Sequence, residues 1–525
     1  MIGIQPLITP ASVGLAGVGG LRFGLSSHFG GLYNYKARRP QESKQPGPGL
    51  ENLMKVAMIQ SNPLTGALWA NMRELVDAAI GVHGTGADLC IAPELAICGH
   101  NIGDMVLRYG FAEECRKVLE AGAARLNEKP GMPPLLLGAP VANPVPQGKP
   151  LQNCAVMLHK GEVIVLSRKV LLPSEGIQDD ARYFEPGVAC GVMHYKGWRL
   201  AVTVGEDAWN YRVFWQGRRK FATDPVEEFM KAGGADGLLN ITALPFEQGL
   251  PAMHRRMLSH LAVRYRVPVL SVNLAGGDDS LVYYGGSQAF DENGELLARA
   301  PSFKASVLLA DISGSGQKSE IAPEISGQEE LWQALVIGTR DYARKCGFSS
   351  AVLGLSGGVD SALTAVIAVE ALGPENVVGI LMPSPFSSQG SVDDSIALAK
   401  ALGIATQTVP ITPVLESFQS AFDKAFEGAF TGVAHENTQA RIRGSLLMAY
   451  SNRFNSLLLT TGNKSEAAVG YATLYGDMCG GIGPIGDLYK HQVYSLCRWY
   501  NTTHKGVIPE SILTKAPSAE LAPGQ

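Results

Sequence analysis

The sequence predicts an α/β protein in two parts, a layered α/β half followed by a half built on a doubly wound parallel sheet. The chain has 525 residues, which exceeds one ordinary domain of about 100–200 residues. Short apolar segments of strand length alternate with segments of helical periodicity along both halves. Residues 313–328 contain Gly, Ser and Pro with little periodicity, and this composition is typical of a linker.

The composition indicates a globular protein and excludes several classes. The hydrophobic fraction is 46% and the charged fraction is 18%, as in well-buried domains. A net charge of −4 argues against a nucleic-acid-binding protein. The eight cysteines form no C-x-x-C pair, which argues against a zinc or disulfide framework and favours a reducing, cytoplasmic location. No run of about 18 apolar residues is present, so we expect no membrane-spanning segment.

Residues 1–52 differ from the rest of the chain. They are Gly-rich and apolar in patches and then turn basic and Pro-rich. A secretory signal carries its positive charge before its apolar region, which is the opposite order. We therefore expect a poorly ordered N-terminal extension, with a short docking arm as the alternative.

Residues 53–312 are predicted to form the first compact half. Lys160-Gly161-Glu162 joins two apolar runs and is a hairpin signal. The predicted strands cover residues 56–59, 88–92, 135–139, 155–158, 163–166, 200–204, 237–240 and 267–273. The predicted helices cover residues 71–82, 226–232 and 253–266.

Residues 329–525 are predicted to form the second half. Strands, loops and helices follow one another there in the order expected of a parallel sheet wound on both faces. The predicted strands cover residues 351–355, 377–382 and 457–460, and the predicted helices cover residues 329–345, 361–372 and 392–402.

A glycine-rich loop joins the strand at residues 351–355 to the helix at residues 361–372. Two glycines allow the backbone to approach an anion closely, and the following helix offers free N–H groups and the positive end of its dipole. A simple Gly-rich turn with an N-cap serine is the alternative, but the strand before and the helix after favour a phosphate cradle. The loop consists of Ser356, Gly357, Gly358, Val359, Asp360 and Ser361.

Asp360 is unusual in a phosphate loop, because a carboxylate repels phosphate. Its presence is explained if Asp360 holds Mg²⁺ that bridges the phosphates. The loop lacks the Gly-Lys-Ser/Thr ending of the Walker type, which argues against a kinase or GTPase.

The loop resembles the pyrophosphate loop of ATP pyrophosphatases, and further segments make residues 329–525 similar to NAD synthetases. These segments are residues 382–385, 390–395, 436–444, 459–466, 469–477 and 513–521. The resemblance implies transfer of AMP from ATP to the nicotinate carboxylate of deamido-NAD⁺, release of pyrophosphate, and attack by ammonia. It implies Mg²⁺ as the cofactor.

The resemblance also implies roles for individual residues of this half. For ATP these are the loop residues together with Thr461 and Lys490, and for Mg²⁺ they are Asp360 and Glu466. For deamido-NAD⁺ they are Asn437, Arg441, Arg443, Glu466 and Asp477. Arg441 and Arg443 lie two positions apart, so on a helix their side chains would point in different directions.

The first half resembles the nitrilase-type amidase domain of glutamine-dependent NAD synthetases. The matching segments are residues 93–99, 168–173 and 182–187. The resemblance implies a four-layer αββα sandwich in which Glu94 is the general base and Lys169 stabilises the oxyanion, while a cysteine attacks glutamine.

Gly205 stands where the resemblance places that cysteine, in the string Val204-Gly205-Glu206-Asp207. Further departures from the family pattern occur at Ala181, Leu250, Leu274 and Ser280. Because glycine has no side chain to form an acyl-enzyme, we expect loss of glutaminase function, with Glu94 and Lys169 retained as a buried ion pair.

The leading hypothesis is an NAD synthetase that takes free ammonia, and the alternatives are a glutamine-hydrolysing NAD synthetase and a non-catalytic nucleotide-binding scaffold. Other ATP pyrophosphatases, such as GMP or asparagine synthetases, lack the string of residues 461–466. The resemblance implies a homo-oligomer. The family continues beyond the position of Gln525 with an acidic segment and a helical region, so we expect a truncated end or a missing lid over the ATP site.

Overall fold

The computed structural model describes residues 53–174, 176–211, 214–215, 220–313 and 319–522. The predicted extension of residues 1–52 therefore lies outside the described residues, as do residues 314–318 of the predicted linker. No helix in the described part of the chain is long and apolar enough to cross a lipid bilayer.

The first half contains two six-stranded sheets. The first sheet has the order β14-β1-β2-β3-β4-β5, in which β1, β2 and β3 run parallel and the remaining neighbours run antiparallel. Its strands are β1 (Lys55–Gln60), β2 (Leu89–Ile91), β3 (Leu135–Ala142), β4 (Leu151–His159), β5 (Glu162–Arg168) and β14 (Ser306–Asp311).

The second sheet has the order β13-β12-β9-β8-β7-β6, with a parallel centre made of β7, β8 and β9. Its strands are β6 (Gly191–Tyr195), β7 (Trp198–Val204), β8 (Gly237–Thr242), β9 (Val269–Asn273), β12 (Gln288–Phe290) and β13 (Leu296–Arg299). A separate hairpin consists of β10 (Ala275–Asp278) and β11 (Leu281–Tyr284).

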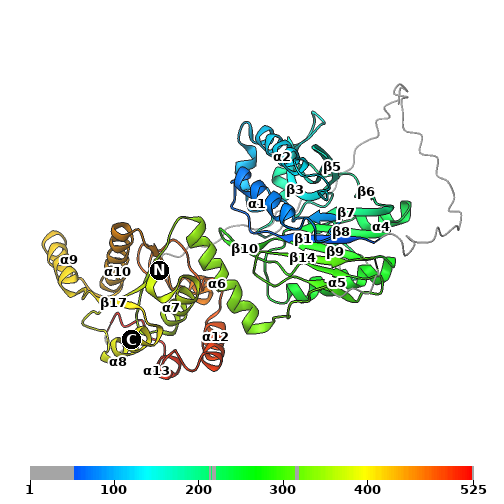
Figure 1. Cartoon of the computed structure of the whole chain (residues 1–525). Helices are drawn as coiled ribbons and strands as arrows, with labels where there is room; N and C mark the ends of the chain where they lie inside the picture. The colour runs from blue at the N-terminus through cyan, green and yellow to red at the C-terminus, as the bar shows by residue number, and fades with distance from the viewer. Residues whose placement is uncertain (1–52, 175, 212–213, 216–219, 314–318, 523–525) are drawn as a thin grey trace, which may run out of the picture. The chain divides into compact units, whose positions relative to one another are not determined.

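Alternating side chains of these strands build a four-layer αββα sandwich. Val56 and Met58 of β1 lie in the core between the two sheets, whereas Ala57 and Ile59 face the helices that cover the first sheet. In Figure 1, α1 and α2 lie on the outer side of the first sheet, and α5 lies on the opposite side, next to β9. Both sheets are thus covered on both faces, and β8 is buried at every position.

The helices of this half are α1 (Leu68–Gly81), η1 (Gly103–Leu107), α2 (Phe111–Asn127), α3 (Asp180–Tyr183), η2 (Gly205–Ala208), α4 (Pro225–Ala232) and α5 (Leu250–Tyr265). Three of them, η1, α3 and η2, have five residues or fewer. The start of α4 shows why the chain turns helical there. The Asp224 side chain accepts from the Glu227 N–H at 3.0 Å, and Pro225 occupies the first helical position.

The second half is a parallel sheet with the order β17-β16-β15-β18 and helices on both faces. Ala351 and Leu353 of β15 face one core, and Val352 faces the other. The strands are β15 (Ala351–Gly354), β16 (Val377–Leu381), β17 (Ala405–Thr408) and β18 (Leu457–Leu458). The helices are α6 (Gly327–Lys345), α7 (Val359–Leu372), η3 (Pro374–Asn376), α8 (Gln389–Leu402), α9 (Thr412–Ala425), α10 (Val433–Phe454), α11 (Lys464–Val469), α12 (Lys490–Thr503) and α13 (Glu510–Thr514).

The strand order reverses beside β15, since the chain proceeds to β16 on one side and later returns to β18 on the other. Ligands of open α/β sheets bind at such a switch point, outside the carboxyl ends of the strands. The glycine-rich loop after β15 lies at this position.

The predicted fold class is confirmed in both halves, and the differences concern single elements. Predicted helix starts fall one to three residues late, as at α1, where the prediction begins at Asn71 and the helix at Leu68. The elements that the prediction left out are α2, β6, the β10–β11 hairpin, β12, β13, β14, β17, α9, α10, α11, α12, α13 and the short helices η1, α3, η2 and η3. Of these, β17 is exposed at all four positions, so it has no apolar period to detect.

Candidate functional site

Backbone contacts and serine hydroxyls shape the loop after β15. Gly357 has φ +74°, and a Cβ there would lie 2.3 Å from the Ser391 carbonyl oxygen, so only glycine fits. The buried Ser361 hydroxyl donates to the Gly358 carbonyl at 3.0 Å and lies 3.1 Å from the Ser356 hydroxyl. Ser361 therefore holds the loop closed, and the backbone N–H groups at the start of α7 are left for an anion.

Three helix starts bring charged side chains together beside this loop. Asp360 lies in the first turn of α7, Glu466 in the first turn of α11, and Lys490 begins α12. The Lys490 ammonium forms an ion pair with Asp360 and lies 3.9 Å from Glu466. The resemblance implies one ATP and Mg²⁺ site for these residues, and the structure brings them together from segments up to 130 positions apart.

Asn463 is a member of this cluster that the sequence analysis missed as a functional residue. Its side chain accepts from the Glu466 N–H at 3.0 Å, which caps α11, and donates to Asp360 Oδ1 at 2.9 Å. In return, the Glu466 carboxylate accepts from the Asn463 N–H at 3.1 Å. The signal in the sequence that could have identified Asn463 was its place in the string of residues 461–466.

The cluster fits a bound Mg²⁺ by its charge and its donor atoms. Two carboxylates share one lysine, and burial together with the nearby Asp360 carboxylate raises the pKa of Glu466. A divalent cation would relieve this repulsion, and carboxylate oxygens are the ligands that Mg²⁺ prefers. Asp360 and Glu466 are therefore the residues that would hold it.

Of the residues predicted to contact deamido-NAD⁺, Glu466 lies in the cluster beside the glycine-rich loop, and the other four fall into two groups. Asn437, Arg441 and Asp477 hold the turn at residues 473–477: Asn437 accepts from the Thr473 hydroxyl at 2.9 Å, Asp477 accepts from the Thr473 N–H at 2.6 Å, and Arg441 donates to the Leu474 carbonyl at 3.2 Å.

Arg443 forms the second group and points elsewhere, donating to the Met382 carbonyl at the end of β16 at 3.1 Å. The two arginines thus face different directions, as predicted. Burial lowers the pKa of Arg443, against the opposing effect of Glu520. Thr461 is half-buried in the connection between β18 and α11.

In the first half, the three positions predicted for an amidase site converge at the ends of strands. Glu94 follows β2, Lys169 follows β5 and Gly205 follows β7. The Lys169 ammonium lies 2.7 Å from Glu94 Oε1, and both side chains are buried, which confirms the predicted ion pair. A Cβ on Gly205 would lie 2.6 Å from Glu94 Oε2 and 2.7 Å from Lys169 Nζ.

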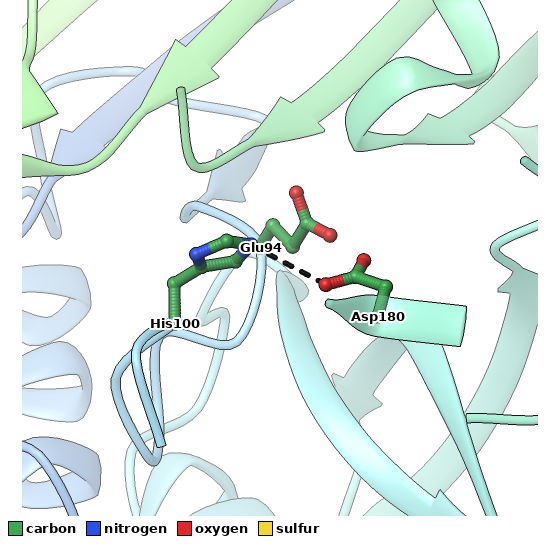
Figure 2. A group of neighbouring side chains, drawn as sticks. All are labelled: Glu94, His100 and Asp180. Carbon is green, nitrogen blue, oxygen red and sulfur yellow. Dashed lines mark ion pairs between the residues drawn. The ribbon is translucent and has the colours of Figure 1, made fainter. Parts of the chain in front are cut away.

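Further polar residues that the sequence analysis missed surround this pair. Asp180 lies 2.5 Å from the Lys169 ammonium, and Asn153 donates to Glu94 at 2.7 Å. His100 Nε2 lies 3.8 Å from Asp180, and Figure 2 shows Glu94, His100 and Asp180 pointing toward one another. Such a trio could chelate a metal ion, but the Lys169 ammonium bonds both carboxylates and already supplies the positive charge.

The charges of this cluster determine one another's pKa. Burial alone would lower the pKa of Lys169, but Asp180 and Glu94 raise it well above its usual range. Burial alone would raise the pKa of Asp180, but Lys169 and His100 lower it. Both groups are therefore charged at neutral pH, and Lys169 is fixed over residue 205.

Asp207 ties the turn at residue 205 to the segment that carries Lys169. It accepts from the N–H groups of Val170 at 2.9 Å and Leu171 at 2.8 Å. Burial raises its pKa to about 7, although these hydrogen bonds and Lys169 lower it. All eight cysteines are free and six are buried, while Cys479 is half-buried and Cys346 is exposed.

Comparisons with known proteins agree with both halves. The NAD synthase family matches residues 331–525, and the carbon-nitrogen hydrolase family matches residues 55–318. The glutamine-dependent NAD(+) synthetase of Synechocystis is 45% identical over 484 residues, covering 90% of this chain and 85% of the relative. That of Thermotoga maritima is 38% identical over 509 residues, with coverage of 90% and 85%.

A solved structure supports the same conclusion. The glutamine-dependent NAD+ synthetase from Acinetobacter baumannii in complex with ADP has a TM-score of 0.80 and 35% identity, and the match covers 89% of this chain and 86% of that one. The chain therefore belongs to the NAD synthetase family in its two-domain form, which joins a carbon-nitrogen hydrolase domain to an NAD synthase domain.

Proposed function

We propose that this chain amidates deamido-NAD⁺ with ATP through an adenylylated intermediate, releasing AMP and pyrophosphate. The observation that carries the proposal is the cluster of Asp360, Asn463, Glu466 and Lys490 beside the glycine-rich loop at the switch point of the sheet. The relative from Acinetobacter baumannii was solved in complex with ADP, which supports nucleotide binding by this chain.

The chemistry explains why such a cluster is needed. The nicotinate carboxylate is a poor electrophile, and transfer of AMP turns it into a mixed anhydride with a good leaving group. The N–H groups at the start of α7 face the departing phosphates, and Lys490 balances the charge that develops on pyrophosphate. Mg²⁺ held by Asp360 and Glu466 would neutralise further phosphate charge.

The nitrogen donor is a separate part of the proposal. The relatives are named glutamine-dependent, which supports glutamine as the donor better than free ammonia. One observation in this chain favours ammonia as a second candidate. Gly205 lies under Glu94 and Lys169 and offers no nucleophile for an acyl-enzyme.

One assay tests both parts. Purified protein is given ATP, Mg²⁺ and deamido-NAD⁺ with either ammonium or glutamine, and NAD⁺, AMP and pyrophosphate are measured. We expect the three products in equal amounts, and ATP binding without turnover would contradict the proposed reaction. Equal rates with the two donors would exclude the ammonia candidate, and NAD⁺ from ammonium alone would exclude the glutamine candidate.

Self-association and a cytoplasmic location also remain proposals. Large apolar side chains lie exposed on and around α9, including Phe418 at 49% and Phe426 at 62%, which supports association of identical chains. The eight free cysteines support a reducing compartment.

A further inference from the structure

A cavity lies in the carbon-nitrogen hydrolase domain, away from residue 205. It has a volume of about 330 Å³ and is lined by the loop between α2 and β3 together with the tips of two hairpins, β4–β5 and β6–β7. Asp88, just before β2, also lines it, whereas Glu94 follows the other end of the same strand. The volume is within the range of small-molecule sites.

The two hairpin tips repeat one arrangement in different sheets. His159-Lys160-Gly161 joins β4 to β5, and Tyr195-Lys196-Gly197 joins β6 to β7. Lys160 has φ +51° and Lys196 has φ +47°, the left-handed conformation that two-residue hairpin turns require. Asn, Asp and Gly are favoured there, and lysine is not. Such outliers suggest a role for the side chain.

The tips also meet in space. The rings of His159 and Tyr195 make an edge contact, with centroids 6.2 Å apart and planes at 84°. Both lysines line the cavity, and Lys129 of the α2–β3 loop is the third. A cation after the end of α2 would by itself be explained by the helix dipole. That explanation does not extend to Lys160 and Lys196, which lie in hairpin turns.

The lining has an excess of positive charge. Asp88 is its single carboxylate; it forms an ion pair with Lys196 and also accepts from the Lys55 N–H at 2.8 Å. Within the described residues, Lys129 and Lys160 form no ion pair. Burial, and after it the Lys160 ammonium, lowers the pKa of His159, against the opposing effect of Glu162.

We propose that this cavity binds a small phosphorylated molecule, held by Lys129, Lys160 and Lys196. Two unpaired ammonium groups and a third that is shared with Asp88 match a ligand with at least two negative charges. Lysine acts as a point charge toward phosphate. The aromatic rings of His159 and Tyr195, which contact each other, would pack against any ring that the ligand carries. This site is independent of the proposed synthase reaction.

Lysine acetylation followed by mass spectrometry tests the site on the full chain. Inorganic pyrophosphate and AMP are the probes, and citrate is a control of similar charge without phosphorus. At ten times the Kd, we expect labelling of Lys129 and Lys160 to slow about tenfold. Lys231, exposed on α4, should be unaffected. Lys490 reports binding at the synthase site separately.

Each outcome decides the proposal. Protection by pyrophosphate or AMP supports it, and stronger protection by AMP shows that a ring is bound. Equal protection by citrate would overturn the assignment to phosphate. Protection of Lys490 without protection of Lys129 and Lys160 would overturn the site itself.

Variants separate binding from folding. Lys160→Asn places a favoured residue in the turn, so its Tm should rise while pyrophosphate protection of Lys129 is lost. Lys129→Met should lose pyrophosphate binding with no rise in Tm, and Lys231→Met should keep pyrophosphate binding. NAD⁺ formation without added probe should be the same in all three. Unchanged protection in Lys160→Asn would contradict the proposal.

Discussion

Asp360 is held from two sides at the synthase site, by the Lys490 ammonium and by the Asn463 amide. Neither contact follows from spacing along the chain, because these residues lie more than 100 positions from Asp360. The Lys490 ammonium lies between the carboxylates of Asp360 and Glu466. In the carbon-nitrogen hydrolase domain, the Lys169 ammonium likewise lies between the carboxylates of Glu94 and Asp180. At the residue scale, both sites depend on a lysine between two carboxylates.

Replacing Lys490 tests its proposed role in the reaction. Lys490→Met should lower the rate of NAD⁺ formation by about 10²–10³-fold, because one preorganised charge is removed from the developing pyrophosphate. The steady-state rate with saturating ammonium and ATP measures the effect. Lys400→Met, at an exposed position of α8, is the matched control and should retain activity. Activity within twofold of the parent would contradict the role of Lys490.

Replacing Gly205 tests the space over the turn. Gly205→Ala should destabilise the protein by about 1–3 kcal/mol, because φ is +54° and the new Cβ meets Glu94 and Lys169. Urea unfolding measures the loss. Gly81→Ala, where a Cβ meets nothing within 4 Å, should show none. Equal effects of the two substitutions would show that the space over residue 205 is open.

Asp207 should make stability depend on pH. Its pKa is raised to about 7 in the folded chain from about 3.9 when unfolded, so between these values the folded state binds more protons. Stability therefore falls as pH rises from about 4 to 7 and changes no further above. Between pH 5 and pH 8, wild type should lose up to about 3 kcal/mol relative to Asp207→Asn in urea unfolding. Asp423→Asn, exposed on α9, should parallel wild type.

At the scale of elements, helix starts form the synthase site. Helices α7, α11 and α12 each contribute a residue of their first turn, and α11 is a short helix whose start is fixed by the capping box of Asn463 and Glu466. The elements near the site that are apolar over most of their length, β15 and α7, were predicted from the sequence. Helix α12 was not, although it carries Lys490, and its position depends on packing against α7.

Asn463 allows its two roles to be separated. Asn463→Ala should cost about 1 kcal/mol of stability through loss of the cap and should also reduce activity. Asn463→Ser keeps a capping oxygen but has no amide that could donate to Asp360. It should therefore unfold like wild type in urea and lose activity. A fully active Asn463→Ser variant would show that the bond to Asp360 is unimportant.

At the scale of the molecule, two domains of different construction share one chain, and apolar surface is left on the second. We expect a homo-oligomer in solution, with the exposed face of α9 as part of the contact. Light scattering with size-exclusion chromatography measures the mass. Phe418→Glu with Phe426→Glu should lower it, and Lys424→Glu, elsewhere on α9, should not. A monomeric parent protein would contradict this expectation.

The sequence by itself determined the fold class, the loop at residues 356–361, and the glycine at position 205. These are local features: apolar periods, a string of adjacent residues, and a residue identity. Only the tertiary structure decided that Asp180 shares Lys169, that Asn463 bonds Asp360, and that Lys129, Lys160 and Lys196 line one cavity. These residues come from separate elements, and their distances depend on how sheets and helices pack, which no spacing along the chain records.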